Sequence, residues 1–221
     1  MNDAAAPGAP GHDRLAARRV PFEGAHNVRD VGGYPTAGGG RVRRGRVYRS
    51  DALFPLTAND LVAFDALGIR TVFDLRGDEE RRAEPNPMPS RHCPLGVGLS
   101  ADQRPDPATL RTIEDGERWL HIEYQHRLAT GGRSIGRLLQ GLCEPDGLPA
   151  LFHCVGGKDR TGLVAAVLLS WLGVDRDTVL DDYELSAQLR TLATEQPFFD
   201  VLVGRGMTAD AATGFLGARA G

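Results

Sequence analysis

A cysteine and an arginine lie six positions apart in the sequence HCVGGKDRTG, which covers residues 153–162. A cysteine thiolate is a strong nucleophile, and the planar fork of an arginine binds two oxygens of one phosphate. The spacing of Cys154 and Arg160 is a weak signal by itself, because the 26 basic residues of the chain include a single lysine, Lys158, and arginine is therefore abundant. The histidine before the cysteine, the glycines inside the loop and the Thr-Gly pair after the arginine make the pattern much more specific.

The segments on either side predict how this stretch is held. Residues 149–152 (PALF) form an apolar, strand-like run, and residues 163–169 (LVAAVLL) are apolar on every side, as in a buried helix. A strand therefore delivers the cysteine into a tight loop that leads into a helix N-terminus. Backbone N–H groups and the positive end of the helix dipole then converge on one anion site, and the same field stabilises a thiolate. The stretch predicts a cysteine-dependent phosphatase.

Each loop residue has an expected role. Cys154 attacks phosphorus in line and forms a phosphocysteine, whereas an inert buried thiol is the alternative. The phosphate oxygens are held by Arg160 and by the backbone N–H groups of the loop, which is composed of Val155, Gly156, Gly157, Lys158, Asp159 and Arg160. The position of the only lysine in this loop indicates either chance or a need for a compact point charge.

The rest of the chain alternates strand-like and helix-like segments. Strands are predicted near residues 47–48, 69–75, 91–95 and 149–152, and helices over 57–67, 117–129, 132–143, 161–172, 175–189, 197–203 and 208–216. This alternation predicts the α/β class, with a central, mainly parallel sheet flanked by helices. A flexible tail rich in Ala, Pro and Gly is expected over residues 1–19, followed by a single domain over residues 20–221.

Composition bounds the partners and the compartment. The formal net charge of −3 argues against a general nucleic-acid binder. Cys93, Cys143 and Cys154 show no paired spacing, which indicates neither a disulfide framework nor a zinc site and favours a reducing compartment. No apolar run is long enough to span a membrane and residues 1–20 do not resemble a secretory signal, so the cytoplasm is expected, with leaderless export as the alternative. The basic stripe Arg41–Arg49 predicts either a solvated face or a rim that attracts phosphorylated substrates.

Residues 153–162 resemble the HCxxGxxRTG signature loop of protein tyrosine phosphatases. With Lys-Asp before the arginine, the loop is similar to that of bacterial tyrosine/serine phosphatases of dual specificity, which also act on phosphoinositide lipids. Further segments resemble landmarks of that family in the same order, namely NVRDVGGY (27–34), RVYRS (46–50), DLR (74–76) with Glu80, and Asp182-Tyr183. The resemblance implies a protein tyrosine phosphatase-like fold and hydrolysis of phosphomonoesters without a metal or another cofactor.

The resemblance also implies roles and partners. Thr161 is expected to donate its hydroxyl to the sulfur of Cys154, unless it is only a first-turn helix residue. His153 is expected to orient the loop, unless it is purely structural. The expected partners are a phosphorylated protein or a phosphoinositide, with phosphate or another oxyanion in the loop. Lys158 adds positive charge that suits substrates with several phosphates.

A general acid must protonate the leaving oxygen and later activate water. Asp102 is the preferred candidate, because it lies in a long loop over residues 96–108 where related phosphatases carry a mobile acid, with Asp106 close behind. Asp159, inside the signature loop, is the other candidate. The alternative for Asp159 is an ion pair with Lys158 or a neighbouring arginine.

Other functions fit the sequence less well. A P-loop NTPase is a poor fit, because Gly157-Lys158 is followed by Asp159 rather than Ser or Thr. A rhodanese-type sulfurtransferase also places a cysteine between a strand and a helix, but in a shorter loop that lacks the final Arg-Thr-Gly. A catalytically silent phosphate-binding module is the non-enzyme rival. The retained Cys154 argues against it, because binding alone needs no thiolate.

Overall fold

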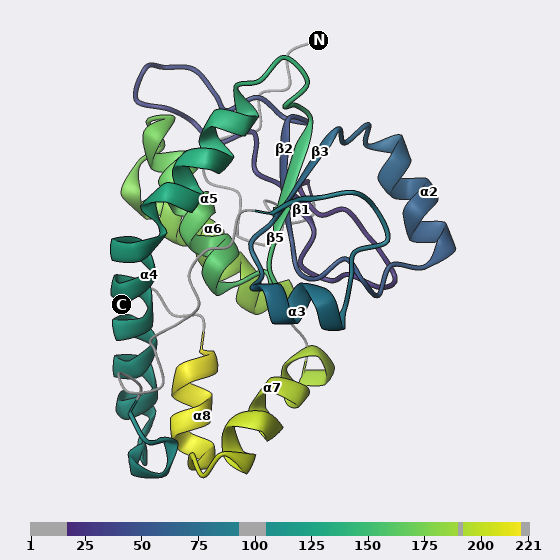
Figure 1. Cartoon of the computed structure of the whole chain (residues 1–221). Helices are drawn as coiled ribbons and strands as arrows, with labels where there is room; N and C mark the ends of the chain where they lie inside the picture. Colours follow the sequence, from purple (N-terminus) through teal and green to yellow (C-terminus); the bar gives the residue numbers. More distant parts are fainter. Residues whose placement is uncertain (1–16, 93–104, 190–191, 218–221) are drawn as a thin grey trace.

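The structure is a computed structural model, and it describes residues 17–92, 105–189 and 192–217 (Figure 1). Its strands are β1 (Arg29–Asp30), β2 (Val47–Ser50), β3 (Thr71–Asp74), β4 (Arg91–His92) and β5 (Ala150–His153). Its helices are α2 (Ala58–Ala66), α3 (Asp78–Ala83), α4 (Ile113–Leu142), α5 (Asp159–Trp171), α6 (Arg176–Leu189), α7 (Leu192–Gly204) and α8 (Ala209–Leu216), with a 3-10 turn η1 (Pro107–Thr109) before α4. The predicted α/β class is confirmed.

The strands form one sheet in the order β1-β2-β5-β3-β4. Among the described strands, only β1 is antiparallel to its neighbour, so the sheet is mainly parallel, as predicted. In the register of the three inner strands, the last residue of β5, His153, pairs with Ser50 of β2 and with Asp74 of β3. The carboxyl ends of these strands are therefore flush, and Cys154 leaves the central strand at the edge where parallel sheets usually place their ligands.

The two faces of the sheet bury different helices. Leu151 and Val72 belong to the core cluster of Phe64 in α2, whereas Phe152 and Phe73 belong to the cluster of α4 and α5. Neighbouring residues thus point to opposite faces, as the two-residue period of a strand requires. Figure 1 shows the result, with α2 on one side of the sheet and α4, α5 and α6 on the other.

Helix α4 corrects one prediction. The sequence predicted two helices, over 117–129 and 132–143, on either side of Gly131. The structure has one helix over Ile113–Leu142, although each interior glycine costs about 1 kcal/mol relative to alanine. The reason is that α4 spans two hydrophobic clusters. Leu138 near its end belongs to the main core, and Trp119 near its start belongs to a second cluster shared with α7 and α8.

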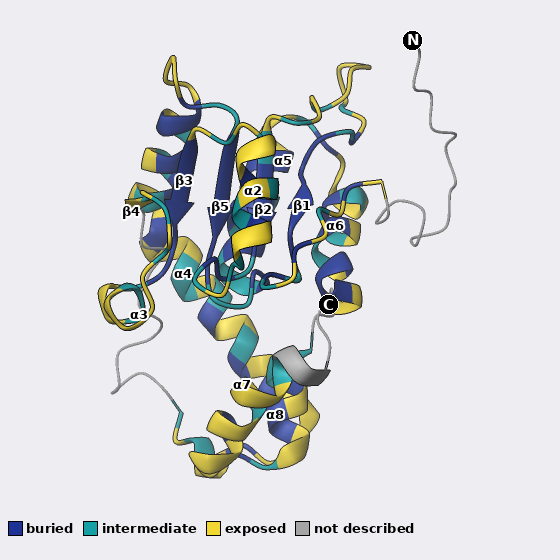
Figure 2. Cartoon of the chain, turned by 90° about the vertical axis from the view of Figure 1, so that its right-hand side faces the viewer, coloured by how far each residue is buried: buried dark blue, intermediate teal, exposed yellow. Residues whose placement is uncertain are grey.

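The second cluster places α7 and α8 beyond the carboxyl edge of the sheet. Leu202 of α7 and Ala211 of α8 pack with Trp119 of α4. Figure 2 shows the two helices below the strands, beside the lower part of α4. Helix α7 also begins at Leu192, well before the predicted start at Pro197, which lies inside it.

The N-terminal boundary differs slightly from the prediction of a tail over residues 1–19. The guanidinium of Arg18 lies 3.6 Å from the ring centroid of Tyr34, and the backbone oxygen of Arg18 accepts a hydrogen bond of 3.0 Å from Asp30 N. Arg18 is buried, so the folded part includes it. Within the described residues, none of the helices combines the length and the apolar composition that crossing a bilayer requires.

Candidate active site

The predicted nucleophile lies at the junction of β5 and the signature loop. Cys154 is 3% exposed, and helix α5 begins five residues later at Asp159. Thr161, in the first turn of α5, donates its hydroxyl to Cys154 Sγ at 3.1 Å. Both readings of Thr161 therefore apply at once, because it is a helix residue and also a hydrogen-bond donor to the sulfur. Such a donor stabilises a thiolate.

The loop backbone is held from outside by its carbonyl groups. Three consecutive carbonyl oxygens accept hydrogen bonds from the body of the fold: Val155 O from Ala52 N at 2.8 Å, Gly156 O from Asn27 Nδ2 at 3.2 Å, and Gly157 O from Arg49 Nη2 at 2.9 Å. In a trans peptide the N–H of the next residue points opposite to the carbonyl. The N–H groups of residues 156–158 therefore point away from these anchors, as an oxyanion cradle requires.

A buried ionic cluster fixes two of these anchors. Asp182 of α6 accepts from Arg49 Nη1 at 2.5 Å, from Arg29 Nε at 3.4 Å and from the hydroxyl of Tyr34 at 2.9 Å. Arg29 also donates to the side-chain oxygen of Asn27. Both arginine side chains are fully buried and that of Asp182 is 1% exposed, so each charge depends on its partners.

The pKa values in this cluster follow from burial and pairing. Burial alone would raise the pKa of Asp182, but the guanidinium groups of Arg29 and Arg49 lower it to about 2. Burial, together with the neighbouring charge of Arg49, lowers the pKa of Arg29 to about 10. Arg29 and Asp182 are therefore both charged at neutral pH. The sequence had marked these residues only as landmarks, and the structure shows that they form the support of the loop.

Gly157 is required where the loop passes this support. Its φ is +64°, and a Cβ at this position would lie 2.7 Å from Asp51 N and 2.8 Å from Asn27 Nδ2. Only glycine combines the left-handed backbone with such a close approach.

Arg160 is oriented by a carboxylate from α3. Its Nη1 and Nη2 donate to the two oxygens of Glu80 at 2.6 and 2.7 Å. Burial opposes the charge of Arg160, but the hydrogen bonds to Glu80 raise its pKa above the ordinary value. Burial would likewise raise the pKa of Glu80, and the same bonds keep it below its ordinary value. A guanidinium has more N–H donors than the two that Glu80 uses, so the pair can hold the fork in place for an oxyanion.

His153 is a structural residue in this geometry. Its Nδ1 lies 3.0 Å from Cys154 O, and its Nε2 lies 3.0 Å from the amide nitrogen of Asn86. The carbonyl can only accept and the amide nitrogen can only donate, so the ring carries its proton on Nδ1. Burial lowers the pKa of His153 to about 4, despite Asp74 nearby. The neutral ring thus orients the peptide of Cys154, which agrees with both readings of this residue.

Lys158 does not extend along the loop floor. Its buried Nζ donates to Leu216 O at 2.8 Å, lies 3.5 Å from Phe215 O, and is 3.5 Å from Asp159 Oδ1. The ammonium group therefore caps the last carbonyls of α8, where the helix dipole favours a positive charge. The only lysine of the chain joins the loop to α8.

The structure describes one of the two candidates for the general acid. Asp102, the preferred one, lies outside the described residues. Asp159 Oδ1 accepts a hydrogen bond of 2.5 Å from the hydroxyl of Tyr124 in α4. Asp106 is exposed and caps η1, with its carboxylate accepting from Ala108 N at 3.0 Å.

A hollow of about 210 Å³ lies over the nucleophile. The loop lines it with Cys154, Val155, Gly156, Asp159 and Arg160. The opposite wall is composed of Leu120, Glu123, Tyr124 and Arg127 from α4, Phe198, Val201 and Leu202 from α7, and Phe215 and Leu216 from α8. The sequence prediction missed this wall, because nothing in the pattern of those helices indicates that they meet the loop.

The basic stripe lies elsewhere. Strand β2 runs parallel to β5, with Val47 beside Ala150 at the far end and Ser50 beside His153 at the loop end. The exposed arginines at 41, 43, 44 and 46 precede β2 and so lie at the end of the sheet remote from Cys154, whereas Arg49 is buried under the loop. The interpretation of this stripe as a rim of the site is wrong.

Two curated proteins and one solved structure are similar to this chain. The triple specificity protein phosphatase PtpB of Mycobacterium tuberculosis is 33% identical over 197 residues, which cover 76% of this chain and 68% of PtpB. A Cupriavidus necator protein named as a tyrosine-protein phosphatase is 31% identical over 226 residues, covering 98% of this chain and 81% of its own length. Among solved structures, the catalytic core of Siw14 aligns over 80% of this chain and 86% of its own, with 13% identity and a TM-score of 0.39.

A model of the family described as the tyrosine phosphatase family matches residues 20–216. The match includes the loop, its anchors and the wall formed by α4, α7 and α8. This chain is therefore a member of the tyrosine phosphatase family.

Proposed function

We propose that this protein hydrolyses phosphomonoesters through a phosphocysteine on Cys154. The observation that carries the proposal is the anchored loop: three carbonyls are held outward, the thiol accepts from Thr161, and Arg160 is aligned by Glu80. The loop N–H groups and the guanidinium are then in position before substrate arrives. Preorganised donors of this kind are the largest single contribution in many enzymes that stabilise developing negative charge.

In the first step the thiolate attacks phosphorus. The bond between phosphorus and the leaving oxygen breaks, its electron pair remains on that oxygen, and a general acid supplies the proton. The equatorial oxygens stay bound to the loop N–H groups and to Arg160 as their charge redistributes.

In the second step a water attacks the phosphocysteine. The bond between phosphorus and sulfur breaks, its electron pair returns to Cys154 Sγ, and a carboxylate accepts the proton of the water. Asp159 is suited to this second role, because it lines the hollow beside Cys154 and already accepts a hydrogen bond. The donor of the first step is Asp102 or Asp159, and the pH profiles of Asp102→Asn and Asp159→Asn distinguish them.

The hollow favours an aryl phosphate as substrate, namely phosphotyrosine in a protein. The part of its wall that α7 and α8 form is apolar and includes two phenylalanine rings, Phe198 and Phe215, which suit contact with a tyrosine ring. The relative from M. tuberculosis is named a triple specificity phosphatase, so dual specificity and phosphoinositide hydrolysis are the second candidate. The charge of Lys158, which lies between the loop and the last carbonyls of α8, favours that candidate.

The mechanism is tested with p-nitrophenyl phosphate in EDTA and a thiol reductant, conditions that match the reducing cytoplasm in which we place this activity. We expect full activity in the wild type, none in Cys154→Ser, and unchanged activity in Cys143→Ser, the matched control at an exposed thiol. Activity that survives Cys154→Ser, or that needs a divalent cation, contradicts the proposal.

The substrate class is tested by comparing kcat/KM for phosphotyrosine peptides, phosphoserine peptides and phosphoinositides in micelles. We expect the phosphotyrosine peptide to be preferred, and Phe215→Ala to reduce its kcat/KM by about tenfold, in line with a lost aromatic contact of about 1 kcal/mol or more. A preference for phosphoinositides that is lost in Lys158→Met assigns the site to the lipid instead.

A further inference from the structure

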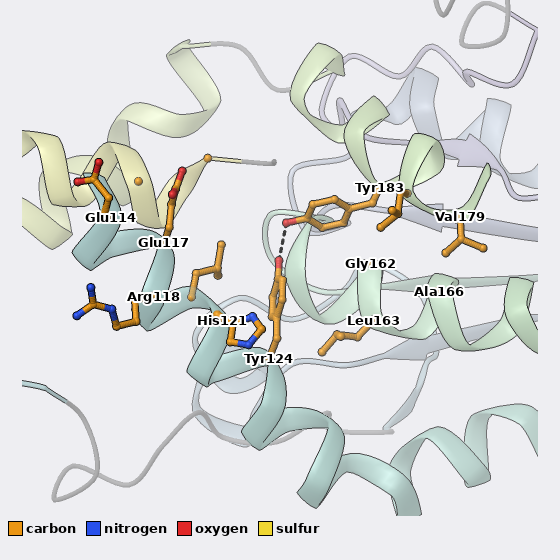
Figure 3. Close-up of a pocket in the computed structure, with 14 residues that line it drawn as sticks. Glu114, Glu117, Arg118, His121, Tyr124, Gly162, Leu163, Ala166, Val179 and Tyr183 are labelled. Atoms are coloured by element: carbon orange, nitrogen blue, oxygen red, sulfur yellow. Dashed lines mark hydrogen bonds between the residues drawn. The ribbon is translucent and has the colours of Figure 1, made fainter. Parts of the chain in front are cut away.

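Two tyrosines and Asp159 form a chain of short hydrogen bonds beside the catalytic hollow. The hydroxyl of Tyr124 in α4 lies 2.5 Å from Asp159 Oδ1 and 2.6 Å from the hydroxyl of Tyr183 in α6. Figure 3 shows the two phenols meeting end to end between their helices. The chain thus joins three helices at a carboxylate that lines the same hollow as Cys154.

The direction of the hydrogen bonds in this chain follows from protonation. Burial, and then the negative charge of Asp159, raise the pKa of Tyr124 far above its ordinary value. Tyr124 therefore keeps its proton and donates it to the carboxylate oxygen. Because that proton is used, the bond between the phenols is donated by Tyr183 to Tyr124. A phenol whose oxygen accepts a hydrogen bond is a stronger donor, so Tyr183 strengthens the bond from Tyr124 to Asp159.

We propose that Tyr124, supported by Tyr183, is a positioning residue that holds Asp159 for proton transfer. The proposal rests on the proposed function, in which Asp159 exchanges a proton with the reacting groups. Tyr124 fixes Oδ1 and thereby sets where Oδ2 points, which is the oxygen that takes the proton of the attacking water. Hydrogen bonds donated to a carboxylate also favour its ionised form, which is the form that can accept a proton.

Other charged groups lie near Asp159 and remain in each variant of this test. Lys158 Nζ lies 3.5 Å from its Oδ1, and Arg160 interacts with its charge. Glu123 and Arg127 of α4, paired at 3.1 Å, line the same hollow. Removing a tyrosine hydroxyl therefore removes one uncharged hydrogen-bond donor and leaves the surrounding charges unchanged.

Phenylalanine is a suitable replacement because the tyrosine rings also form a wall. Tyr124 lines both the catalytic hollow and a second, larger pocket of about 870 Å³ between α4, α5 and α6, and Tyr183 lines the second pocket. The rings meet edge to face, with centroids 6.3 Å apart at 87°. The ring of Tyr183 also packs against Gly162, where a Cβ would approach it to 2.9 Å. Phenylalanine keeps this wall and removes only the hydroxyl.

The test compares pH profiles of kcat and kcat/KM for p-nitrophenyl phosphate. Asp159→Asn is expected to remove the limb of the profile that reports the ionisation of Asp159. Tyr124→Phe is expected to keep that limb but move it to higher pH, and to lower kcat by about tenfold, a fraction of what general acid–base catalysis contributes, with KM within about twofold. Tyr183→Phe is expected to move the limb in the same direction by less. Tyr48→Phe, which removes the hydroxyl of a tyrosine that packs in the cluster on the α2 face of the sheet, is the matched control and leaves the limb in place.

A double variant separates positioning from packing. In the background of Asp159→Asn, adding Tyr124→Phe is expected to cost no further kcat, because the two residues act through one hydrogen bond. A further tenfold loss in that background, or an unmoved limb in Tyr124→Phe, overturns the proposal while leaving the role of Asp159 intact. If Asp159→Asn keeps every limb, the role of Asp159 itself fails, which is a distinct result.

Discussion

The signature loop lies between two supports of opposite kinds. On the side of the sheet, it is bound by buried charges and amides, chiefly Asn27, Arg49 and, through Arg49, Asp182. On the side of α7 and α8, it faces apolar side chains across the hollow and is joined to α8 by Lys158. The first support specifies the direction of each peptide group, and the second one specifies the shape of the space above the sulfur.

The difference shows that one part of the molecule sets the orientation of the loop and another part sets access to the sulfur of Cys154. Buried ion pairs contribute little net stability compared with apolar packing, but breaking one is costly because it leaves a charge without a partner. Such a cluster tolerates few alternative arrangements and keeps the loop carbonyls outward. The helices on the other side belong to a separate hydrophobic cluster, so changes there are expected to alter the hollow without disturbing the loop. Five substitutions, from the largest expected effect to the smallest, test this division.

Asp182→Asn is expected to have the largest effect. It leaves Arg29 and Arg49 buried with their compensating charge removed, and breaking a buried pair costs about 3–5 kcal/mol. The free energy of unfolding, measured in urea at pH 7, is expected to fall by that amount, with loss of phosphatase activity. Asp65→Asn, at an exposed carboxylate of α2, is the control and stays close to wild type. A change in Asp182→Asn as small as in the control contradicts the assigned importance of the cluster.

His153→Asn tests the side of the sheet through the pH dependence of the free energy of unfolding. The pKa of His153 is lowered to about 4 in the folded protein, from 6.5 for an ordinary histidine, so only the unfolded chain takes up this proton as the pH falls from 6.5 to 4. Stability is unaffected above pH 6.5 and decreases through this window, by about 3 kcal/mol at 1.36 kcal/mol per pH unit. Asparagine can still donate to Cys154 O but does not titrate. We expect the free energy of unfolding of His153→Asn to change less between pH 7 and 4 than that of the wild type. The same pH dependence in both proteins would refute the buried neutral state of His153.

Lys158→Met tests the support on the other side. The substitution removes the ammonium that binds Leu216 O and keeps most of the apolar stem, at an expected cost of about 1–3 kcal/mol for the hydrogen bonds lost. Hydrogen exchange is expected to show faster exchange in α8 and unchanged protection in β2 and β5. If protection falls equally in the sheet, the two supports are not separate.

Arg43→Ala and Arg46→Ala are expected to have the smallest effect. Both side chains are exposed, at the end of the sheet remote from the loop. We expect kcat/KM for a phosphopeptide to stay within about twofold of wild type even at low salt, where long-range steering is strongest. A larger decrease that disappears at high salt indicates that the stripe attracts substrate from a distance.

Local patterns predicted the parts of this fold that depend on local chemistry. The capping box of Thr57 and Asp60 starts α2, and Gly68, with φ of +64°, ends it. The parallel sheet and the strand–loop–helix setting of Cys154 were also predicted, because each depends on neighbouring residues. The single helix α4 was missed, since its continuity over Gly131 depends on clusters at both ends.

The partners of the candidate site residues could not be read from the sequence for the same reason. Glu80 and Arg160 are eighty positions apart, and Tyr124 and Asp159 thirty-five. No spacing rule connects such residues, because the fold alone brings them together. Lys158 was noticed for its rarity, but its contact with α8 follows only from where that helix packs.

The central claim is that phosphate is transferred to Cys154, and the most direct test is to trap that intermediate. The enzyme is mixed with p-nitrophenyl phosphate, quenched in acid within the first turnovers and digested, and the peptides are mapped by mass spectrometry. We predict a phosphoryl group on the peptide that contains Cys154, which accumulates further in Asp159→Asn if that residue activates the water. A phosphoryl group on any other residue, or an acid-quenched Cys154 peptide that stays unmodified during turnover in both enzymes, would contradict the account.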